Sequence, residues 1–260
     1  PLIAIVPISF SVSPFMVFTE GMLAWPPDPE AWSLRWYKNM IGDCSADVVS
    51  STVPCSKKWM VGTVNSLFIG IIATAIATAL GTMAALGLSR PHMPYKALIM
   101  SILISPMIVP LIITAAGMFF FYARINLVYT FTGVILAHVA LATPFVVITV
   151  TATLVGFDMN MVKAAQSLGA RPIRTFFKVI MPLILPGIIS GALFAFITSF
   201  DEVVIVMFMA SIDQLTIPKQ MWAGIRQEIS PVILCMATCL VILSIVLLTT
   251  VELLRLSLIH

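Results

Sequence analysis

Long apolar runs alternate with shorter polar turns through most of this sequence, and this alternation restricts the fold more than any other feature. Several runs reach or exceed the roughly 20 residues that a helix needs to cross a bilayer. Hydrophobic residues make up 60% of the chain and charged residues only 10%, with a mean hydropathy of +1.08. Soluble globular proteins carry about 25% charged residues. We therefore predict an all-α polytopic membrane protein.

Six transmembrane helices are predicted, within a single transmembrane domain that comprises residues 1–260. They cover residues 2–19, 61–88, 97–122, 131–155, 183–209 and 232–254. The longest polar stretch, residues 20–60, is predicted to be a loop on the membrane surface, and a second polar loop covers residues 158–182. The chain is apolar from Pro1 onward, so we expect a native N-terminal segment before it, with a cleaved signal peptide as the alternative.

The distribution of charge predicts which side of the membrane holds the termini. Six spans place both termini on one side, and Lys and Arg are equally numerous on the two sides. The short turns 89–96 and 161–178 are nevertheless densely basic, with Asp158 as the single acid beside them, whereas the loop 20–60 mixes acidic and basic residues. Short cytoplasmic loops are enriched in Lys and Arg, so we predict cytoplasmic termini. All five tryptophans then fall on the outer side, where their rings suit a headgroup layer.

The cysteines fit this orientation. Cys44 and Cys55 lie in the outer loop, where they either form a disulfide in an oxidising compartment or remain two free thiols. Cys235 and Cys239 are one helical turn apart in the sixth span, but no His or carboxylate lies near them in the sequence. We expect the second pair to be packing residues and predict no metal site.

The polar interruption 161–186 separates two apolar blocks and has its own pattern. Gly169 can adopt the positive φ that ends a helix, and Pro172 can begin a new one. Before the glycine, apolar residues recur at helical spacing: Met161, Val162, Ala165 and Leu168. The pattern predicts a short helix, a turn and a second helix, presented to a soluble partner.

Ionisable residues within apolar runs are candidates for function because they are costly in hydrocarbon. Asp201 and Glu202 are adjacent in the fifth predicted span, where they either attract a cationic solute or form a structural pair satisfied by helix ends or a neighbouring subunit. His138 lies in the fourth span, where it is either part of a pathway or a hydrogen-bonded packing residue.

Signatures of catalysis and of nucleic-acid binding are missing from the sequence. It contains no phosphate-binding GxxxxGK[ST], no HExxH and no GxSxG, and its three histidines are scattered. The net charge of +3 is small and the basic residues are dispersed between apolar runs. We predict a protein that is not an enzyme, binds no nucleic acid and contacts membrane lipid.

The interruption resembles a known family motif. Lys163-Ala164-Ala165, then Gly169-Ala170, Phe176 and Val179-x-Met181-Pro182, is similar to the EAA loop of ATP-binding-cassette (ABC) importer permeases. The departures are Lys163 where the motif usually has Glu, and Val179 and Met181 where it has Ile and Leu. The resemblance extends over nearly the whole chain, through SLRWY at 33–37, TPFVV at 143–147, SFDEVV at 199–204 and TIPKQMW at 216–222. These sequence stretches most resemble those of the second permease of spermidine/putrescine-type (polyamine) transporters.

The resemblance implies a type I ABC importer permease fold, with a coupling helix between helices 4 and 5. It implies multi-pass insertion in a bacterial cytoplasmic (inner) membrane, a second related permease, two copies of an ABC ATPase subunit and a periplasmic or surface-tethered substrate-binding protein. ATP and Mg²⁺ would bind to the ATPase subunits and no cofactor to this chain. Mapped onto this sequence, ATPase coupling would rest on Lys163, Ala164, Ala165, Leu168, Gly169 and Ala170.

Alternating access would then carry a small, cationic solute such as spermidine or putrescine. Alternatives within the same class are an opine, an amino-acid derivative, another organic amine or a metal ion. A cation-coupled secondary transporter could also use Asp201 and Glu202, but two halves of matching hydropathy, which are common in such folds, are not apparent. A membrane scaffold or channel would need no docking loop.

Overall fold

The structure is a computed structural model that describes residues 2–26, 28–43, 45, 57–90, 92–158, 160–227 and 230–259. In this described part the regular structure is helical, and the one β-type feature is an isolated bridge between Ser11 and Trp32. The chain packs as two compact units. Unit 1 combines Pro1–Ser66 with Ile212–His260, and unit 2 is Leu67–Ser211. The first boundary between the units lies within the long helix α4 (Lys58–Leu88). After Ser211 the chain enters unit 1 again.

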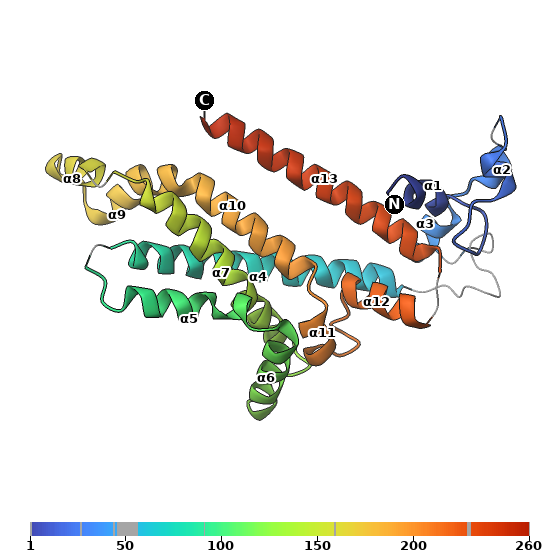
Figure 1. Cartoon of the computed structure of the whole chain (residues 1–260), viewed down its shortest axis with the longest axis horizontal. Coiled ribbons are helices and arrows are strands. Elements are labelled where there is room, and N and C mark those ends of the chain that lie inside the picture. The colour runs from blue at the N-terminus through green and yellow to red at the C-terminus, as the bar shows by residue number, and fades with distance from the viewer. Residues whose placement is uncertain are drawn as a thin grey trace. The chain divides into compact units, whose positions relative to one another are not determined.

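Unit 2 is a bundle of apolar helices (Figure 1). After the end of α4 it contains α5 (Lys96–Ile108), α6 (Leu111–Arg124), α7 (Phe131–Val155), α8 (Asn160–Ser167), α9 (Pro172–Thr175), the π-helix η2 (Phe176–Ile180), α10 (Met181–Phe200) and α11 (Val204–Met209). Helix α7 is the most buried of these and packs along α10. Gly187 and Gly191 permit this approach, because a Cβ at either position would collide with Thr153 or Thr149 of α7.

Three helices of the described chain are long and apolar enough to cross a membrane: Lys58–Leu88, Phe131–Val155 and the continuous Pro172–Phe200. A fourth candidate is the pair α5 and α6, which are bent by 103° at Pro110. The bend has a local cause, since Val109 precedes a proline and adopts an extended conformation. The predicted third span, 97–122, is therefore a broken one. Six spans were predicted, and the described residues identify three or four.

Two further spans differ from their predicted bounds. The first, 2–19, is helical only over α1 (Leu2–Ser9), because residues 10–12 pair with 31–33 through hydrogen bonds such as Ser33 N to Phe10 O at 2.7 Å. The fifth, 183–209, is interrupted after Phe200, and a new helix, α11, begins at Val204. Helix α13 (Val232–Ile259) covers the sixth predicted span.

Unit 1 is built around α13. Besides α1 and the start of α4 it contains α2 (Glu20–Leu23), the 3₁₀ turn η1 (Pro29–Ala31), α3 (Arg35–Met40) and α12 (Ile217–Gln227). Helices α1 and α3 both pack against α13. The indole Nε1 of the fully buried Trp36 donates to Ser11 O at 2.8 Å, and Cys235 Sγ donates to Ser9 O at 3.3 Å. Cys235 is thus a packing residue, whereas Cys44 and Cys55 lie outside the described residues.

Candidate functional site

The segment 158–182, which we call the coupling segment, forms the predicted helix, turn and second helix. Helix α8 ends at Ser167 and is closed by Gly169, whose φ is +82°. Gly169 N donates to Gln166 O at 2.9 Å and Ala170 N donates to Ala165 O at 3.0 Å. This pair of bonds is a Schellman motif, which satisfies the last carbonyl groups of a helix. Pro172 then begins α9, so the local prediction from Gly169 and Pro172 is confirmed.

The turn presents apolar side chains to its surroundings. Helix α8 contains no buried residue, and the Leu168 side chain is 89% exposed. Lys163 and Ala164 are exposed, while Ala165 and Ala170 are partly buried on the inner side of the turn. Ile173, at the start of α9, is also largely exposed. Exposed apolar side chains at the tip of a turn are typical of a surface that another protein covers.

The coupling segment continues directly into a spanning helix. Helices α9, η2 and α10 form one continuous helix of 29 residues, Pro172–Phe200, which is about 44 Å long at 1.5 Å per residue. The π-helical turn η2 lies where Pro182 would otherwise meet the carbonyl group of Lys178, four residues earlier. A wider turn relieves that clash, and π turns of this kind are frequent at functional sites.

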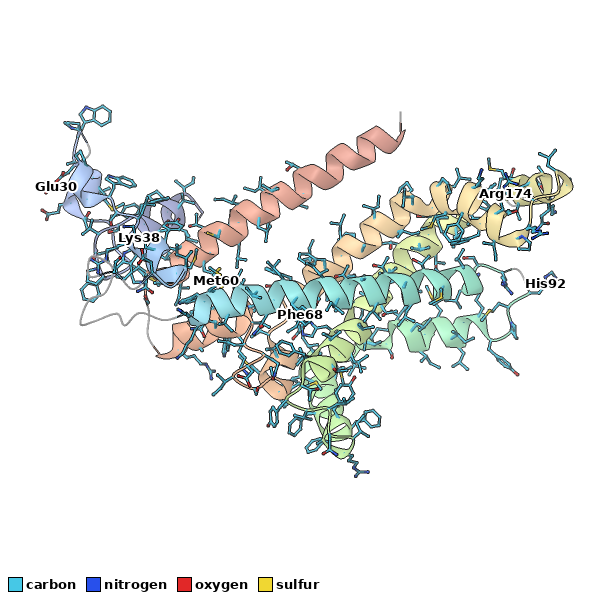
Figure 2. All side chains as sticks on the ribbon, turned by 180° about the vertical axis from the view of Figure 1, so that it is seen from behind. Glu30, Lys38, Met60, Phe68, His92 and Arg174 are labelled. Carbon is cyan, nitrogen blue, oxygen red and sulfur yellow. The ribbon has the colours of Figure 1, made fainter. Side chains whose placement is uncertain are left out.

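A pocket of about 250 Å³ lies at the base of the coupling segment. It is lined by the ends of α4 and α7 and by η2, through Leu86, Ser89, Arg90, Leu154, Phe157, Phe176 and Ile180. The basic turn after α4 and the coupling segment therefore lie at the same end of unit 2, where Figure 2 shows both His92 and Arg174.

The opposite end of the continuous helix carries the two adjacent carboxylates, in different environments. Asp201 is exposed at the C-terminal cap of α10, where the negative end of the helix dipole disfavours a carboxylate. Glu202 is 7% exposed, and its Oε1 accepts from Ile205 N at 2.9 Å, so it caps the start of α11. Glu202 lies beyond the spanning helix, and burial raises the pKa of its carboxyl group, against the lowering effect of the hydrogen bond from Ile205.

These environments give the two carboxylates different roles. Glu202 satisfies a helix end, which is the structural alternative for this pair. No comparable structural partner is apparent for the Asp201 side chain among the described residues, and its position costs helix stability. A carboxylate beside the negative end of a helix is well suited to attract a cation.

His138 lies in the interface between α7 and α10. It is 1% exposed, and its Nδ1 is 2.8 Å from Ser199 Oγ. Within the described chain its Nε2 is enclosed without a hydrogen-bond partner. The position fits a packing histidine that joins α7 to the end of α10. Ser199 lies in the SFDEVV stretch at 199–204, but helical spacing cannot identify it as the partner of a residue 61 positions away.

The predicted site residues thus form two groups at the two ends of one helix. Lys163 to Ala170 lie at the coupling end, and His138, Asp201 and Glu202 lie toward the other end. Among the described residues, no group of three His, Cys, Asp or Glu side chains could hold a metal ion. The arrangement suits mechanical transmission along a helix.

Comparison with known proteins agrees with this arrangement. Residues 60–258 match the family described as binding-protein-dependent transport system inner membrane component. The chain is 30% identical over 184 residues to the spermidine/putrescine transport system permease protein PotC of Haemophilus influenzae, covering 71% of this chain and 72% of that protein. It is 29% identical over 245 residues to the putrescine transport system permease protein PotI of Escherichia coli, covering 92% and 79%.

A solved structure shares the fold. The structure of a bacterial ABC transporter involved in the import of the acidic polysaccharide alginate superposes with a TM-score of 0.72, over 97% of this chain and 89% of that chain. The sequence identity is only 14%, so this likeness concerns the fold alone.

Proposed function

Because the chain belongs to the family of binding-protein-dependent transport system inner membrane components, we propose that it is one of two permease subunits of an ABC importer for polyamines. Spermidine or putrescine would cross between this chain and a second, related permease by alternating access. A binding protein would deliver the cargo, and two ATPase subunits would bind ATP and Mg²⁺ and perform the hydrolysis. The termini and the coupling segment would face the cytoplasm.

The observation that carries this proposal is the exposed coupling segment at the end of a continuous helix. A channel without a soluble partner would not need an exposed leucine, Leu168, at the tip of a turn between two helices. In an importer the same turn fits a groove of the ATPase, and motion of the ATPase moves α9 and α10 together. Lys163, Ala164, Ala165, Leu168, Gly169 and Ala170 form this contact or keep its shape.

The cargo is proposed on separate grounds. The names of the relatives point to polyamines, and the exposed carboxylate of Asp201 beside the negative end of α10 supports a cationic solute. An opine, an amino-acid derivative, another organic amine or a metal ion would use the same coupling. A binding screen with the partner binding protein distinguishes these cargoes, and tight binding of a neutral or acidic solute in place of polyamines would refute the polyamine assignment.

Substitution of Gly169 tests the coupling. Gly169→Val introduces a branched side chain at φ +82°, where L residues are strained, although no atom within 4 Å obstructs it. We expect Gly169→Val to abolish the cargo-stimulated ATP hydrolysis of the reconstituted importer while the subunits remain assembled. Gly169→Asn is the matched control, because asparagine tolerates this backbone conformation, and it should retain most of the stimulation. Equal stimulation in the two variants would exclude a role for the turn.

A further inference from the structure

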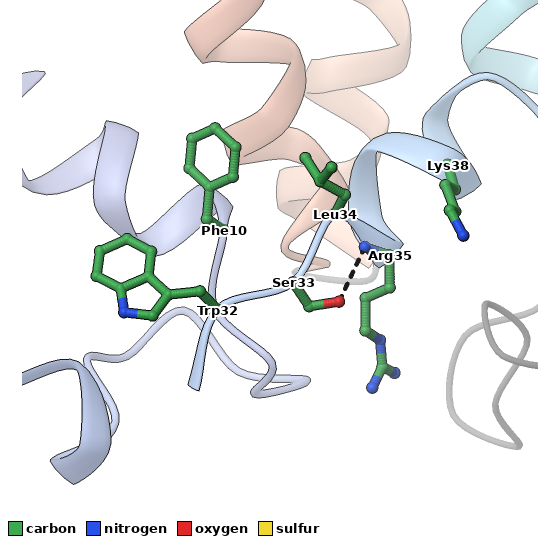
Figure 3. A pocket seen from close by; sticks show the side chains of 6 residues that line it. All are labelled: Phe10, Trp32, Ser33, Leu34, Arg35 and Lys38. Carbon is green, nitrogen blue, oxygen red and sulfur yellow. Dashed lines mark hydrogen bonds between the residues drawn. The ribbon is translucent and has the colours of Figure 1, made fainter. Parts of the chain in front are cut away.

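A second pocket, of about 690 Å³, lies within unit 1, between the end of α1 and the start of α3 (Figure 3). Among the described residues, six line it: Phe10, Trp32, Ser33, Leu34, Arg35 and Lys38. Its volume lies within the range of about 300–1,000 Å³ that is typical of small-molecule sites. Ser33 Oγ accepts from Arg35 N at 3.1 Å, which fixes the start of α3 and so directs the side chains that follow. None of these six residues belongs to the continuous helix Pro172–Phe200.

The polar wall of this pocket is cationic. Arg35 and Lys38 lie three residues apart on α3, hence on one face, and none of the six lining residues is acidic. The Arg35 guanidinium lies over the Trp36 ring at 4.3 Å, which fixes its plane. It makes one long hydrogen bond, from Nη1 to Val12 O at 3.4 Å, and within the described chain its enclosed Nε has no partner. The guanidinium therefore retains donors for an anion.

The other wall of the pocket is aromatic. Figure 3 shows the Phe10 and Trp32 rings on the side of Ser33 away from the Arg35 side chain. In the stretch of chain between Phe10 and Trp32, the side chain of Phe15 is 70% exposed and that of Trp25 is 94% exposed. Amphipathic and aromatic rings of this kind gather at the level of the lipid headgroups. A cationic pocket lined by such rings has the chemistry that an anionic lipid headgroup requires.

We propose that this pocket binds the phosphate group of an anionic phospholipid. The guanidinium N–H groups of Arg35 would donate hydrogen bonds to the phosphate oxygens, and Lys38 would add a second positive charge. Phe10 and Trp32 would contact the glycerol and the upper acyl chains. The proposed polyamine cargo is excluded here, because two cations would repel it. The site thus anchors unit 1 to one leaflet of the membrane, independently of which solute the importer carries.

Native mass spectrometry of the assembled importer, released from nanodiscs that contain phosphatidylglycerol and phosphatidylcholine, tests the proposal. The readout is the number of retained phosphatidylglycerol molecules as their proportion in the nanodisc is varied. Removing one cationic side chain near a membrane surface should weaken the binding of phosphatidylglycerol to the importer about fivefold. We expect this for Arg35→Gln and for Lys38→Gln, and a larger loss for the double variant. Arg35→Lys keeps the charge and should lose less than Arg35→Gln.

Arg226→Gln is the matched control, because the Arg226 guanidinium also lies over a tryptophan ring, that of Trp222 at 5.2 Å, but does not line this pocket. It should retain as much phosphatidylglycerol as the unsubstituted importer. Equal retention by Arg35→Gln, Lys38→Gln and this control would overturn the proposal. The proposal would also be overturned if inorganic phosphate protected the detergent-solubilised importer against thermal denaturation as strongly as phosphatidylglycerol does. A third contrary outcome is weakened affinity for the binding protein with lipid retention unchanged, which would assign the pocket to a protein partner.

Discussion

At the scale of single residues, two neighbours of the same chemistry have opposite surroundings. Asp201 is exposed at the end of α10, whereas Glu202 is buried and caps α11. We predict that Asp201→Asn raises the KM for uptake of a cationic solute roughly tenfold, the order expected for losing one charged contact. The measurement is uptake of radiolabelled polyamine into proteoliposomes that contain the full importer and ATP.

Glu202→Gln is the control for this prediction, because the glutamine oxygen can still accept from Ile205 N, so uptake should be unchanged. The stability of the same variant should depend on pH differently from that of the unsubstituted protein. Burial raises the pKa of Glu202, so its contribution to stability is fully present below the pKa of an exposed glutamate, about 4.3, and is lost as pH rises through the folded-state pKa. Glu202→Gln should therefore raise Tm more at pH 7 than at pH 4. An uptake defect in Glu202→Gln with none in Asp201→Asn would reverse the assignment.

Helix packing at Gly191 allows a second prediction at this scale. A Cβ at Gly191 would lie 3.0 Å from Val146 Cα and would collide with Thr149 Oγ1. Gly191→Ala should therefore destabilise the packing of α7 against α10 by about 1–3 kcal/mol, as overpacking of a core does. Thermal denaturation in detergent measures it, with Gly117→Ala as the control, since no atom lies within 4 Å of a Cβ there. Equal Tm values for the two variants would contradict this packing.

At the scale of the elements, the coupling segment was the most predictable part of the chain. Its signals are local, because Gly169 and Pro172 determine where one helix ends and the next begins. The breaks in the apolar runs were less predictable. A proline within an apolar run indicates a break, as at Pro110, but hydropathy does not detect the interruption after Phe200. Nor can it show that Glu202 caps α11 or that His138 bonds Ser199, because both depend on burial and on tertiary contacts.

The exposed tip of the coupling segment gives a prediction for that element. If Leu168 enters a groove of the ATPase, Leu168→Glu forfeits about 1.5–3 kcal/mol of apolar burial and leaves an unpaired charge in the contact. The ATPase should then be lost when the complex is purified through a tag on this chain, at least tenfold more than without the substitution. The matched control is Leu23→Glu, a leucine that is 71% exposed in α2, outside the segment. Comparable ATPase retention in the two variants would argue against docking at Leu168.

At the scale of the whole molecule, the source of energy separates an ABC permease from a secondary transporter. An importer driven by ATP should keep its uptake rate when an ionophore dissipates the proton gradient while ATP is maintained. A secondary transporter should lose nearly all uptake under the same conditions. The measurement is initial polyamine uptake by cells that express the complete importer, with the cellular ATP level monitored. Loss of uptake at constant ATP would refute the proposed energy source.

The continuity of the helix Pro172–Phe200 also constrains the evolution of this sequence. An α-helix turns by about 100° per residue, so inserting or deleting one residue between the coupling segment and Asp201 would rotate one end against the other by that angle. A substitution within the helix leaves that register intact. Lineages of this permease should therefore tolerate replacements in α10 but almost no single-residue insertions or deletions, while the loops accept changes in length.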